Sequence, residues 1–489
     1  MNKLLFQLDH IMATSSFVDR LLLVVGTGLV VFFVSFQLFE SPETWMDEGL
    51  IMQSAIGVLA TGKAALPVAP GIFEPAWYIT TGFPVTLPLA GLFALFGVSL
   101  EVARLMMAAW LFVFFGAVFV YTRRAMHKSI AWLSFFFLIF FAPLYGNGRN
   151  VLGEVPGIVC MVLALLPLVR GGGLTRTRAV WVGVWAGLAV ATKPIFVLFL
   201  PALLLVLILH RRELNLRRVY VFGGLGVLVP LVLWAVLQFG HTPLSNIFSL
   251  YANPHSVDLS TALFSNSKRL ITELQPLYFL AALATWVVSY IVRRVRRETV
   301  FAAEEVLLFF SVLIFFAYLR TAGYYRYFFP AQVLALLYLP QSIWYLARKG
   351  NKVLFAVAGV VLLCMLAFQA HVTFFRSWVA VHYSATRTGE LESYFETLPH
   401  TQEVFVYQAP EIVPFAYAHA VSQYVLVTPT VIVGERYRPQ VLSGTASLVL
   451  VPGELYLREA TTTFQHYRVS QQIDTYSVLT TERPAVPMR

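Results

Sequence analysis

Four acidic residues follow directly after the first long apolar run of this sequence. They are Glu40, Glu43, Asp47 and Glu48, within the segment ESPETWMDEG at residues 40–49. The apolar run at residues 21–39 is long enough to reach across a bilayer, so these acids lie where a helix should leave it. A carboxylate near hydrocarbon must be solvated, paired or protonated, which makes the adjacent Asp47 and Glu48 costly there. The segment is therefore either a site that uses carboxylate chemistry or a solvated loop without a function.

The composition identifies the class of protein around this segment. Of 489 residues, 58% are hydrophobic and 12% charged, and the mean hydropathy is +0.73. Soluble proteins carry about 25% charged residues, so the chain is predicted to be a polytopic membrane protein. Cys160 and Cys364 both fall in apolar runs, which argues against a disulfide framework. The first run has no small-residue cleavage site, and we interpret it as an uncleaved first helix.

The net charge of +10 does not indicate a nucleic-acid partner, because the basic residues lie in short clusters between apolar runs. After residue 370 there are eight Lys and Arg against ten Asp and Glu. Clusters of this kind set membrane topology and do not form a phosphate-binding face. We expect no nucleic acid among the partners.

The apolar runs are shorter, on average, than the roughly 20 residues that a full span needs. Some helices must therefore be broken, tilted or capped by polar protein. The runs cover residues 21–39, 84–97, 103–121, 130–144, 155–169, 180–191, 195–209, 219–237, 276–292, 306–319, 327–346 and 353–369.

Five basic connections should all lie on the cytoplasmic side. They contain the basic residues of segments 123–128, 170–178, 211–218, 293–297 and 348–352. All five connections can lie on the cytoplasmic side only if the short, Pro-bounded run 84–97 does not cross the membrane. We therefore assign this run to a re-entrant or juxtamembrane helix on the outer side. Lys193-Pro194 is assigned to a turn between two short helices. The prediction is about eleven spans, a cytoplasmic N-terminus and an outer C-terminus.

In this topology the outer segments contain charged residues of a kind that is more usual on the cytoplasmic side. The first outer loop covers residues 40–102, and the cluster of acids and bases at one membrane face is typical of a functional site. The outer segments contain Asp47, Glu48, Glu74, Arg104, Arg149, Glu154, Lys193, His241, His255 and Arg326.

The composition changes at about residue 371. We predict helices at 390–398 and 410–420, and strands at 403–407, 424–428, 447–451 and 476–480. Residues 371–489 should form a small extracytoplasmic α/β domain. The domain shows no Gly-rich phosphate loop and no catalytic motif, so it is either a lid or acceptor-docking domain, or a folding appendage.

Seven motifs in order resemble a known family over roughly residues 20–370. They are Asp47-Glu48, FP at 83–84, GLFALFG at 91–97, EVARL at 101–105, Arg149 followed by Glu154-Val-Pro156, GLAVATKP at 187–194 and YRYFFP at 325–330. In this order they look like the GT-C glycosyltransferases of the protein O-mannosyltransferase and aminoarabinose-transferase type. The resemblance implies an all-α polytopic membrane protein with a GT-C-like catalytic domain over residues 1–370.

The resemblance also implies sugar transfer from a polyprenyl-phosphate-linked donor to an acceptor hydroxyl on the outer face. The acceptor would be a protein, a lipid or a surface glycan. This chemistry needs a carboxylate that takes the acceptor proton, cations that stabilise the departing phosphate, and an apolar groove for the prenyl chain. Asp47 matches the base, Glu48 would orient it, and Glu154 matches a second acidic position. The donor phosphate would be bound by Lys193, Arg326, Arg149 and Tyr325, with Arg326 suited to a bidentate contact.

A divalent metal ion is an optional cofactor, with Glu48, Glu74 and His241 as candidate ligands. No two-ligand spacing recurs, which favours structural roles for His241 and His255, and a loop role is the alternative for Glu74. Lys193 could instead be an interfacial lysine, and Arg326 could mark a helix end. Tyr324, Tyr325 and Trp45 fit an interfacial aromatic belt as well as a sugar site.

Two other functions remain to be weighed. A transporter or lipid flippase predicts ionisable residues in mid-span and two matching halves, and the sequence shows few of the former and no repeat. A scaffold without catalytic activity would tolerate Asp47→Asn. An enzyme that uses Asp47 as its base would not tolerate this substitution.

Overall fold

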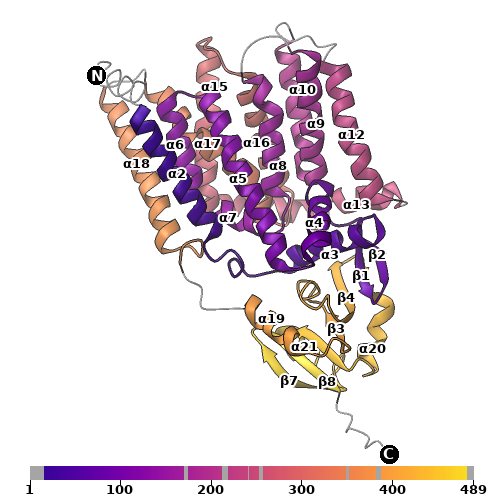
Figure 1. Ribbon diagram of the computed structural model, residues 1–489. Coiled ribbons are helices and arrows are strands. Elements are labelled where there is room, and N and C mark those ends of the chain that lie inside the picture. The colour runs from indigo at the N-terminus through magenta and orange to yellow at the C-terminus, as the bar shows by residue number, and fades with distance from the viewer. Residues whose placement is uncertain are drawn as a thin grey trace, which may run out of the picture.

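The structure is a computed structural model that describes residues 16–169, 174–211, 219–240, 242–252, 257–348, 352–381 and 387–481. A bundle of helices carries a small sheet domain at one end (Figure 1). The predicted combination of a helical membrane part with a C-terminal sheet domain is thereby confirmed.

The helices of the bundle follow the predicted apolar runs. They are α2 (Ser16–Ser35), α5 (Leu100–Ala125), α6 (Lys128–Ile139), α7 (Ala142–Arg149), α8 (Glu154–Leu165), α9 (Arg176–Thr192), α10 (Phe199–Leu209), α12 (Gly224–Trp234), α15 (Leu274–Val295), α16 (Ala302–Leu319), α17 (Phe329–Ala347) and α18 (Lys352–Phe375). Between α12 and α15 lie α13 (Leu244–Ala252) and α14 (Leu259–Thr272).

Six helices in the described part are long and apolar enough to cross a membrane. The pair α6 and α7, bent by 61°, would make a seventh if it forms one span. Shorter apolar helices, including Glu154–Leu168 and Pro194–Leu209, fall below this length. The predicted eleven spans therefore stay a prediction, because several require short or broken helices.

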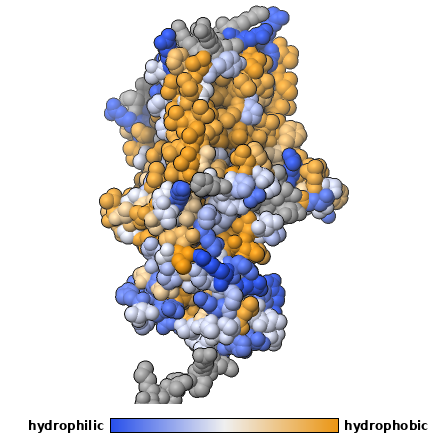
Figure 2. All heavy atoms as spheres, turned by 90° about the vertical axis from the view of Figure 1, so that its right-hand side faces the viewer, coloured by the Kyte–Doolittle hydropathy of each residue, from blue (hydrophilic) through white to orange (hydrophobic). Residues whose placement is uncertain are grey.

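On the face shown in Figure 2, apolar side chains cover the helical bundle, whereas hydrophilic side chains gather on the sheet domain. On α12, Leu225 is 57% exposed and Val229 68%; on α18, Val353 is 68% exposed and Leu363 62%. Soluble monomers rarely expose contiguous apolar surfaces of this size. The exterior is that of an integral membrane protein.

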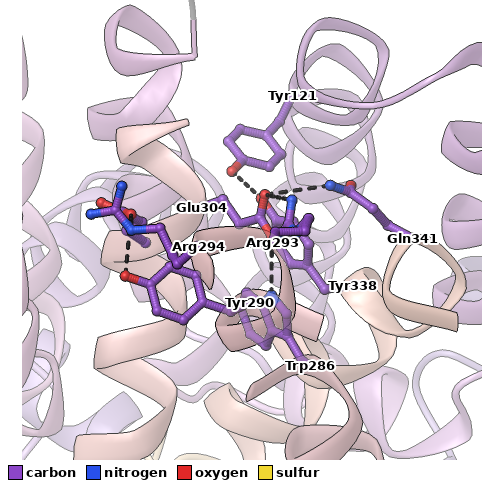
Figure 3. Close-up of polar contacts among 9 residues, drawn as sticks. Tyr121, Trp286, Tyr290, Arg293, Arg294, Glu304, Tyr338 and Gln341 are labelled. Carbon is purple, nitrogen blue, oxygen red and sulfur yellow. Dashed lines mark hydrogen bonds and ion pairs between the residues drawn. The ribbon is translucent and has the colours of Figure 1, made fainter. Parts of the chain in front are cut away.

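A buried polar network joins α15, α16 and α17 (Figure 3). Arg293 and Glu304 form an ion pair in which both side chains are 3% exposed. Gln341 and the Trp286 indole each donate to Glu304 at 3.3 Å, and the Trp286 ring stacks on Tyr338 at 4.3 Å. Buried charges are tolerated when they are paired and hydrogen-bonded, so this network fixes three helices at the connection from α15 to α16.

Ion pairs also join the basic connections to neighbouring helix ends. Asp19, near the start of α2, lies 3.2 Å from Arg123 and 3.1 Å from Lys128 of the α5–α6 connection. His210 after α10 lies 2.7 Å from Glu305 at the start of α16. The start of α2 lies at the end of the bundle opposite the sheet domain (Figure 1). The connection between α5 and α6 therefore lies at the end of the bundle opposite the sheet domain, as expected if this end is on the predicted cytoplasmic side.

The first long loop forms a compact layer between the bundle and the sheet domain (Figure 1). It contains α3 (Met46–Thr61), an antiparallel hairpin of β1 (Ala65–Ala69) and β2 (Ile72–Pro75), and α4 (Phe83–Phe96). The predicted short run 84–97 corresponds to α4. Juxtamembrane helices were expected in the first outer loop, but the position of α3 was not predicted, and neither was the hairpin. Asp47 and Glu48 in the first turn of α3 favour its start, and Gly62 at φ 75° ends it.

The C-terminal domain is a six-stranded mixed sheet in the order β5-β4-β3-β6-β8-β7. Its elements are α19 (Arg387–Thr397), β3 (Glu403–Tyr407), β4 (Ala420–Thr428), β5 (Val431–Val433), α20 (Arg438–Leu442), β6 (Leu448–Pro452), α21 (Gly453–Glu459), β7 (Tyr467–Ile473) and β8 (Tyr476–Thr481). The predicted helix at 410–420 is wrong. That segment consists of turns, because Pro410 and Pro414 have no amide hydrogen to donate.

The sheet domain is attached to α3 by close backbone packing and buried amides. The Gln423 side chain donates to Gln53 of α3 at 2.5 Å, and the Gln53 side chain donates to the Pro410 carbonyl at 2.7 Å. A Cβ placed on Gly49 would lie 2.3 Å from the Cα of Glu411. The helix α3, which carries Asp47 and Glu48 in its first turn, is therefore fixed to the sheet domain.

We predict that docking of the sheet domain weakens as the pH rises. Glu392 of α19 lies beside Glu101 of α5, and burial together with the hydrogen bond and charge of Glu101 raises the pKa of Glu392 from 4.5 to about 8. Glu396 raises the pKa further and Arg104 lowers it. Because the docked state holds the proton more tightly, stability should be lost between pH 4.5 and 8. Limited proteolysis between the bundle and the domain, as a function of pH, measures this.

Glu392→Gln should flatten the pH profile of cleavage, since the amide is uncharged at every pH. The matched control is Glu403→Gln, at an exposed position on β3, which should keep the wild-type profile. A Glu392→Gln protein with an unchanged profile would contradict the prediction.

Candidate active site

Asp47 at the start of α3 forms an ion pair with Arg326. Arg326 belongs to the short helix η5 (Tyr325–Tyr327) that connects α16 to α17. The guanidinium lies over the rings of Trp45 at 5.0 Å, Tyr327 at 5.4 Å and Tyr324 at 5.9 Å. The aspartate is 31% exposed and the arginine 21%, so a ligand has access to both. The predicted base and the predicted phosphate ligand are in direct contact.

Glu154 at the start of α8 forms a second ion pair, with Lys193 at the end of α9. Both side chains are buried, at 1% and 8% exposure. Burial lowers the pKa of Arg326, but the charges of Asp47 and then Glu154 raise it, and the net shift is upward. The two ion pairs therefore act on each other. We call Asp47, Glu154, Lys193 and Arg326 the charge cluster.

Several buried polar atoms at or near the charge cluster have no hydrogen-bond partner among the described residues. They include Oε2 of Glu154, Nε of Arg326 and Oγ1 of Thr81. Thr81 lies beside the cluster, since a Cβ on Gly153 would be 3.3 Å from its Oγ1 and 3.2 Å from the Cβ of Lys193. Buried polar atoms are normally paired, so these atoms fit a site that a polar ligand completes. Thr81 was missed because it belongs to none of the motifs.

Glu48 points away from Asp47 into a fully buried pair with Arg104. The Arg104 guanidinium donates to both carboxylate oxygens, at 3.2 and 3.0 Å, and to the carbonyls of Leu38 and Phe39. The Val151 amide donates to the same carboxylate at 3.3 Å. Arg104 thus braces the loop. Glu48 fixes the start of α3 and orients Asp47 through the backbone.

Arg149 and Tyr325 have partners outside the charge cluster. The guanidinium of Arg149 is fully buried and donates to the carbonyls of Phe33, Ser41 and Val379. Tyr325 lies under the guanidinium of Arg269 at 4.5 Å. Neither contact places these two side chains with Asp47, Glu154 and Lys193, although both were predicted to bind the donor.

The described candidates for metal binding are dispersed. Glu74 of β2 accepts from the Gly434 amide at 3.1 Å and lies 4.0 Å from Arg436, whereas Glu48 is bound to Arg104. His241 and His255 lie outside the described residues. Within the described ranges, no group of three or more His, Cys, Asp and Glu residues could hold a metal ion. Glu48 and Glu74 therefore do not share a metal site within the described part of the chain.

Comparisons with known proteins agree on the architecture. Residues 84–236 match the family model "Dolichyl-phosphate-mannose-protein mannosyltransferase". The structure of ArnT from Cupriavidus metallidurans bound to undecaprenyl phosphate aligns over 95% of this chain and 98% of its own, with a TM-score of 0.64 and 15% identity. The Archaeoglobus fulgidus oligosaccharyltransferase in complex with Zn and sulfate aligns over 91% of this chain and 71% of its own, with a TM-score of 0.56 and 16% identity. A search of curated proteins by sequence returned no match.

The chain has the GT-C fold. The family resemblance predicted from the ordered motifs is confirmed. The matched family segment contains Glu154 and Lys193, whereas Asp47 and Arg326 lie outside it. The GT-C fold here brings these two parts of the chain together at the junction between the bundle and the first loop.

We predict that Arg104→Met severely destabilises the protein. The substitution leaves the Glu48 carboxylate, which has 0% exposure, without its cation, and breaking a buried pair typically costs about 3–5 kcal/mol. The thermal midpoint of the purified protein in detergent measures the effect. Arg436 is 55% exposed in its pair with Glu74, so Arg436→Met should cost about 1 kcal/mol or less. Equal midpoints for the two variants would disprove the prediction.

Proposed function

We propose that this protein is a membrane glycosyltransferase that moves a sugar from a polyprenyl-phosphate-linked donor to an acceptor hydroxyl, with Asp47 as the general base. The observation that carries the proposal is the charge cluster, in which Asp47 contacts Arg326 and the charge of Glu154, the partner of Lys193, also acts on Arg326. The GT-C fold supports it, because the ArnT structure bound to undecaprenyl phosphate shares this architecture, and so does that of the oligosaccharyltransferase AglB from Archaeoglobus fulgidus in complex with an inhibitory peptide and a dolichol-phosphate.

The proposed step is an inverting displacement at the anomeric carbon. The acceptor oxygen forms a bond to this carbon while its proton passes to a carboxylate oxygen of Asp47. The bond from the anomeric carbon to the phosphate oxygen breaks, and its electron pair stays on the phosphate. One carboxylate close to both acceptor and sugar suffices for this chemistry.

Lys193 and Arg326 are the proposed phosphate ligands. Negative charge grows on the phosphate as the bond breaks, and preorganised cations in a site shielded from water stabilise it. Arg326 has a buried Nε without a partner in the described part of the chain, so its planar fork has a donor left for a phosphate oxygen. Glu154 would hold Lys193 in place and offer its second oxygen to a substrate hydroxyl.

We further propose that the charge cluster and the sheet domain face the outside of the cell membrane and that the N-terminus is cytoplasmic. Asp19, Arg123 and Lys128 meet at the opposite end of the bundle, and basic clusters of this kind favour the cytoplasmic side. The apolar exterior of the bundle would accommodate the prenyl chain of the donor.

We predict that Asp47→Asn reduces sugar transfer by roughly 10²–10⁴-fold, the usual contribution of a general base. The amide keeps the shape of the side chain but cannot accept the proton. The assay incubates purified protein with a panel of polyprenyl-phosphate sugars and measures release of the polyprenyl phosphate and transfer of the sugar. Parallel reactions with EDTA, and with Zn²⁺ added back, test the optional metal.

The matched control for this variant is Glu40→Gln, in the same loop but outside the charge cluster. It should keep wild-type turnover. Expression and thermal midpoint should be equal for the two variants. Normal turnover of Asp47→Asn would remove the assignment of the base.

A further inference from the structure

A pocket of about 440 Å³ opens on the side of Arg326 and is not explained by the charge cluster. Its walls come from the α2–α3 connection, from α7 and the residues after it, and from the segment that follows α18. The volume lies within the range of small-molecule sites. The lining residues used below are Glu43, Trp45, Asn150, Arg326 and Trp378. We call this the tryptophan pocket.

Asn150 gives the pocket an unused polar group. Its side chain is 4% exposed, and its Oδ1 has no hydrogen-bond partner among the described residues. A buried carbonyl oxygen without a donor is costly, and few occur in folded proteins. A ligand that donates a hydrogen bond, such as a hydroxyl group, would satisfy it.

The two tryptophans are held in place by cations. The Arg326 guanidinium lies 5.0 Å from the Trp45 ring centroid, and the Arg149 guanidinium lies 5.5 Å from that of Trp378. Arg149 is fixed by the carbonyls of Phe33, Ser41 and Val379. Ser41 lines the pocket on the side of Trp45, and Val379 directly follows Trp378. A Cβ on Gly146 would lie 3.1 Å from the Trp378 ring, so the glycine leaves room for the indole. The pocket is a built site with two oriented aromatic walls.

The chemistry of the walls selects among ligands. A prenyl chain would leave Oδ1 of Asn150 without a partner among the described residues, which is unfavourable for an apolar ligand. A free phosphate would meet the Glu43 carboxylate. A sugar ring combines apolar C–H faces, which pack on aromatic surfaces, with hydroxyl groups that donate to carbonyl and carboxylate oxygens.

We propose that the tryptophan pocket binds a pyranose ring, with Trp45 and Trp378 as its apolar walls and Asn150 and Glu43 as acceptors for its hydroxyls. One part of this proposal rests on the proposed function: that the ring lies beside the reacting centre, because Arg326 belongs to both the pocket and the charge cluster. The ring could belong to the acceptor or to the donor, and the two sources are separated by experiment. Arg149 is then a positioning residue for the pocket.

The first experiment measures binding of methyl α-D-mannopyranoside, methyl α-D-glucopyranoside and methyl β-D-galactopyranoside to the full-length protein in detergent, by saturation-transfer difference NMR. Asn150→Ala should weaken binding of the recognised glycoside roughly fivefold, the value of one hydrogen bond. Trp378→Ala should weaken it by a similar factor or more. Trp378→Phe, which keeps an aromatic wall, should restore part of the loss and covers the case in which the alanine variant does not fold.

The matched controls are Asn246→Ala on α13 and Trp181→Ala on α9, both at exposed positions away from the pocket. They should bind as the wild type does. The proposal is overturned if no glycoside binds, or if the pocket variants bind as tightly as the controls.

A second experiment identifies the source of the ring. If the pocket holds the acceptor, Asn150→Ala should raise the KM for the acceptor and leave hydrolysis of the polyprenyl-phosphate sugar unchanged. If it holds the donor sugar, the KM for hydrolysis should rise about fivefold. Either result supports a sugar pocket. Glycoside binding that depends on Asn150 in a protein without any hydrolysis or transfer would sink the proposed function and leave the pocket standing.

Discussion

The ion pair between Asp47 and Arg326 is the contact on which the rest of the site depends. It joins the first turn of α3 to the connection between α16 and α17, two segments that the chain separates by most of the bundle. A charge pair with limited access to water needs partners on every side. Aromatic rings cover the guanidinium, and the charge of Glu154, the partner of Lys193, acts on it. The ends of α3, α8, α9 and α17 are therefore placed together by electrostatics as much as by apolar packing.

That pair is useful only if α3 cannot move, and the structure holds this helix from two directions. Glu48 is bound to Arg104 on the bundle side. On the other side Gly49 and Gln53 pack against the sheet domain, with backbone approaching so closely that no side chain fits at Gly49. The C-terminal domain thus contributes to the site by supporting α3, whatever else it binds. This is a physical reason for a sheet domain without a catalytic motif of its own.

The sequence predicted four residues that the fold brings together, Asp47, Glu154, Lys193 and Arg326, because charges at the ends of apolar runs leave few places for them at a membrane face. Residue type alone could not separate Asp47 from Glu48, and only the family resemblance assigned the base to Asp47. Two adjacent acids look equivalent until the helix forms and turns them about 100° apart, one to Arg326 and one to Arg104. Nor could the sequence show that Arg149 is not a phosphate ligand. The partners of Arg149 are the backbone carbonyls of Phe33, Ser41 and Val379, all far from it in the chain. The turns at 410–420 were mistaken for a helix because apolar spacing outweighed two prolines, and α3 was missed because all its faces are buried and it has no apolar period.

Arginine at position 326 suits the proposed reaction better than lysine would. Before transfer the negative charge is on Asp47, and after transfer Asp47 holds a proton and the charge has grown on the phosphate. A group that contacts both can stay paired throughout without moving. A planar guanidinium with five donors can face a carboxylate with one edge and a phosphate with another, whereas a single ammonium must choose between them. Among the described residues Nε of Arg326 has no hydrogen-bond partner, whereas Nη1 donates to Asp47, and this is the arrangement that the exchange requires. The same guanidinium lies on the Trp45 ring, so the position of the tryptophan pocket follows from the position of the charge that the reaction transfers.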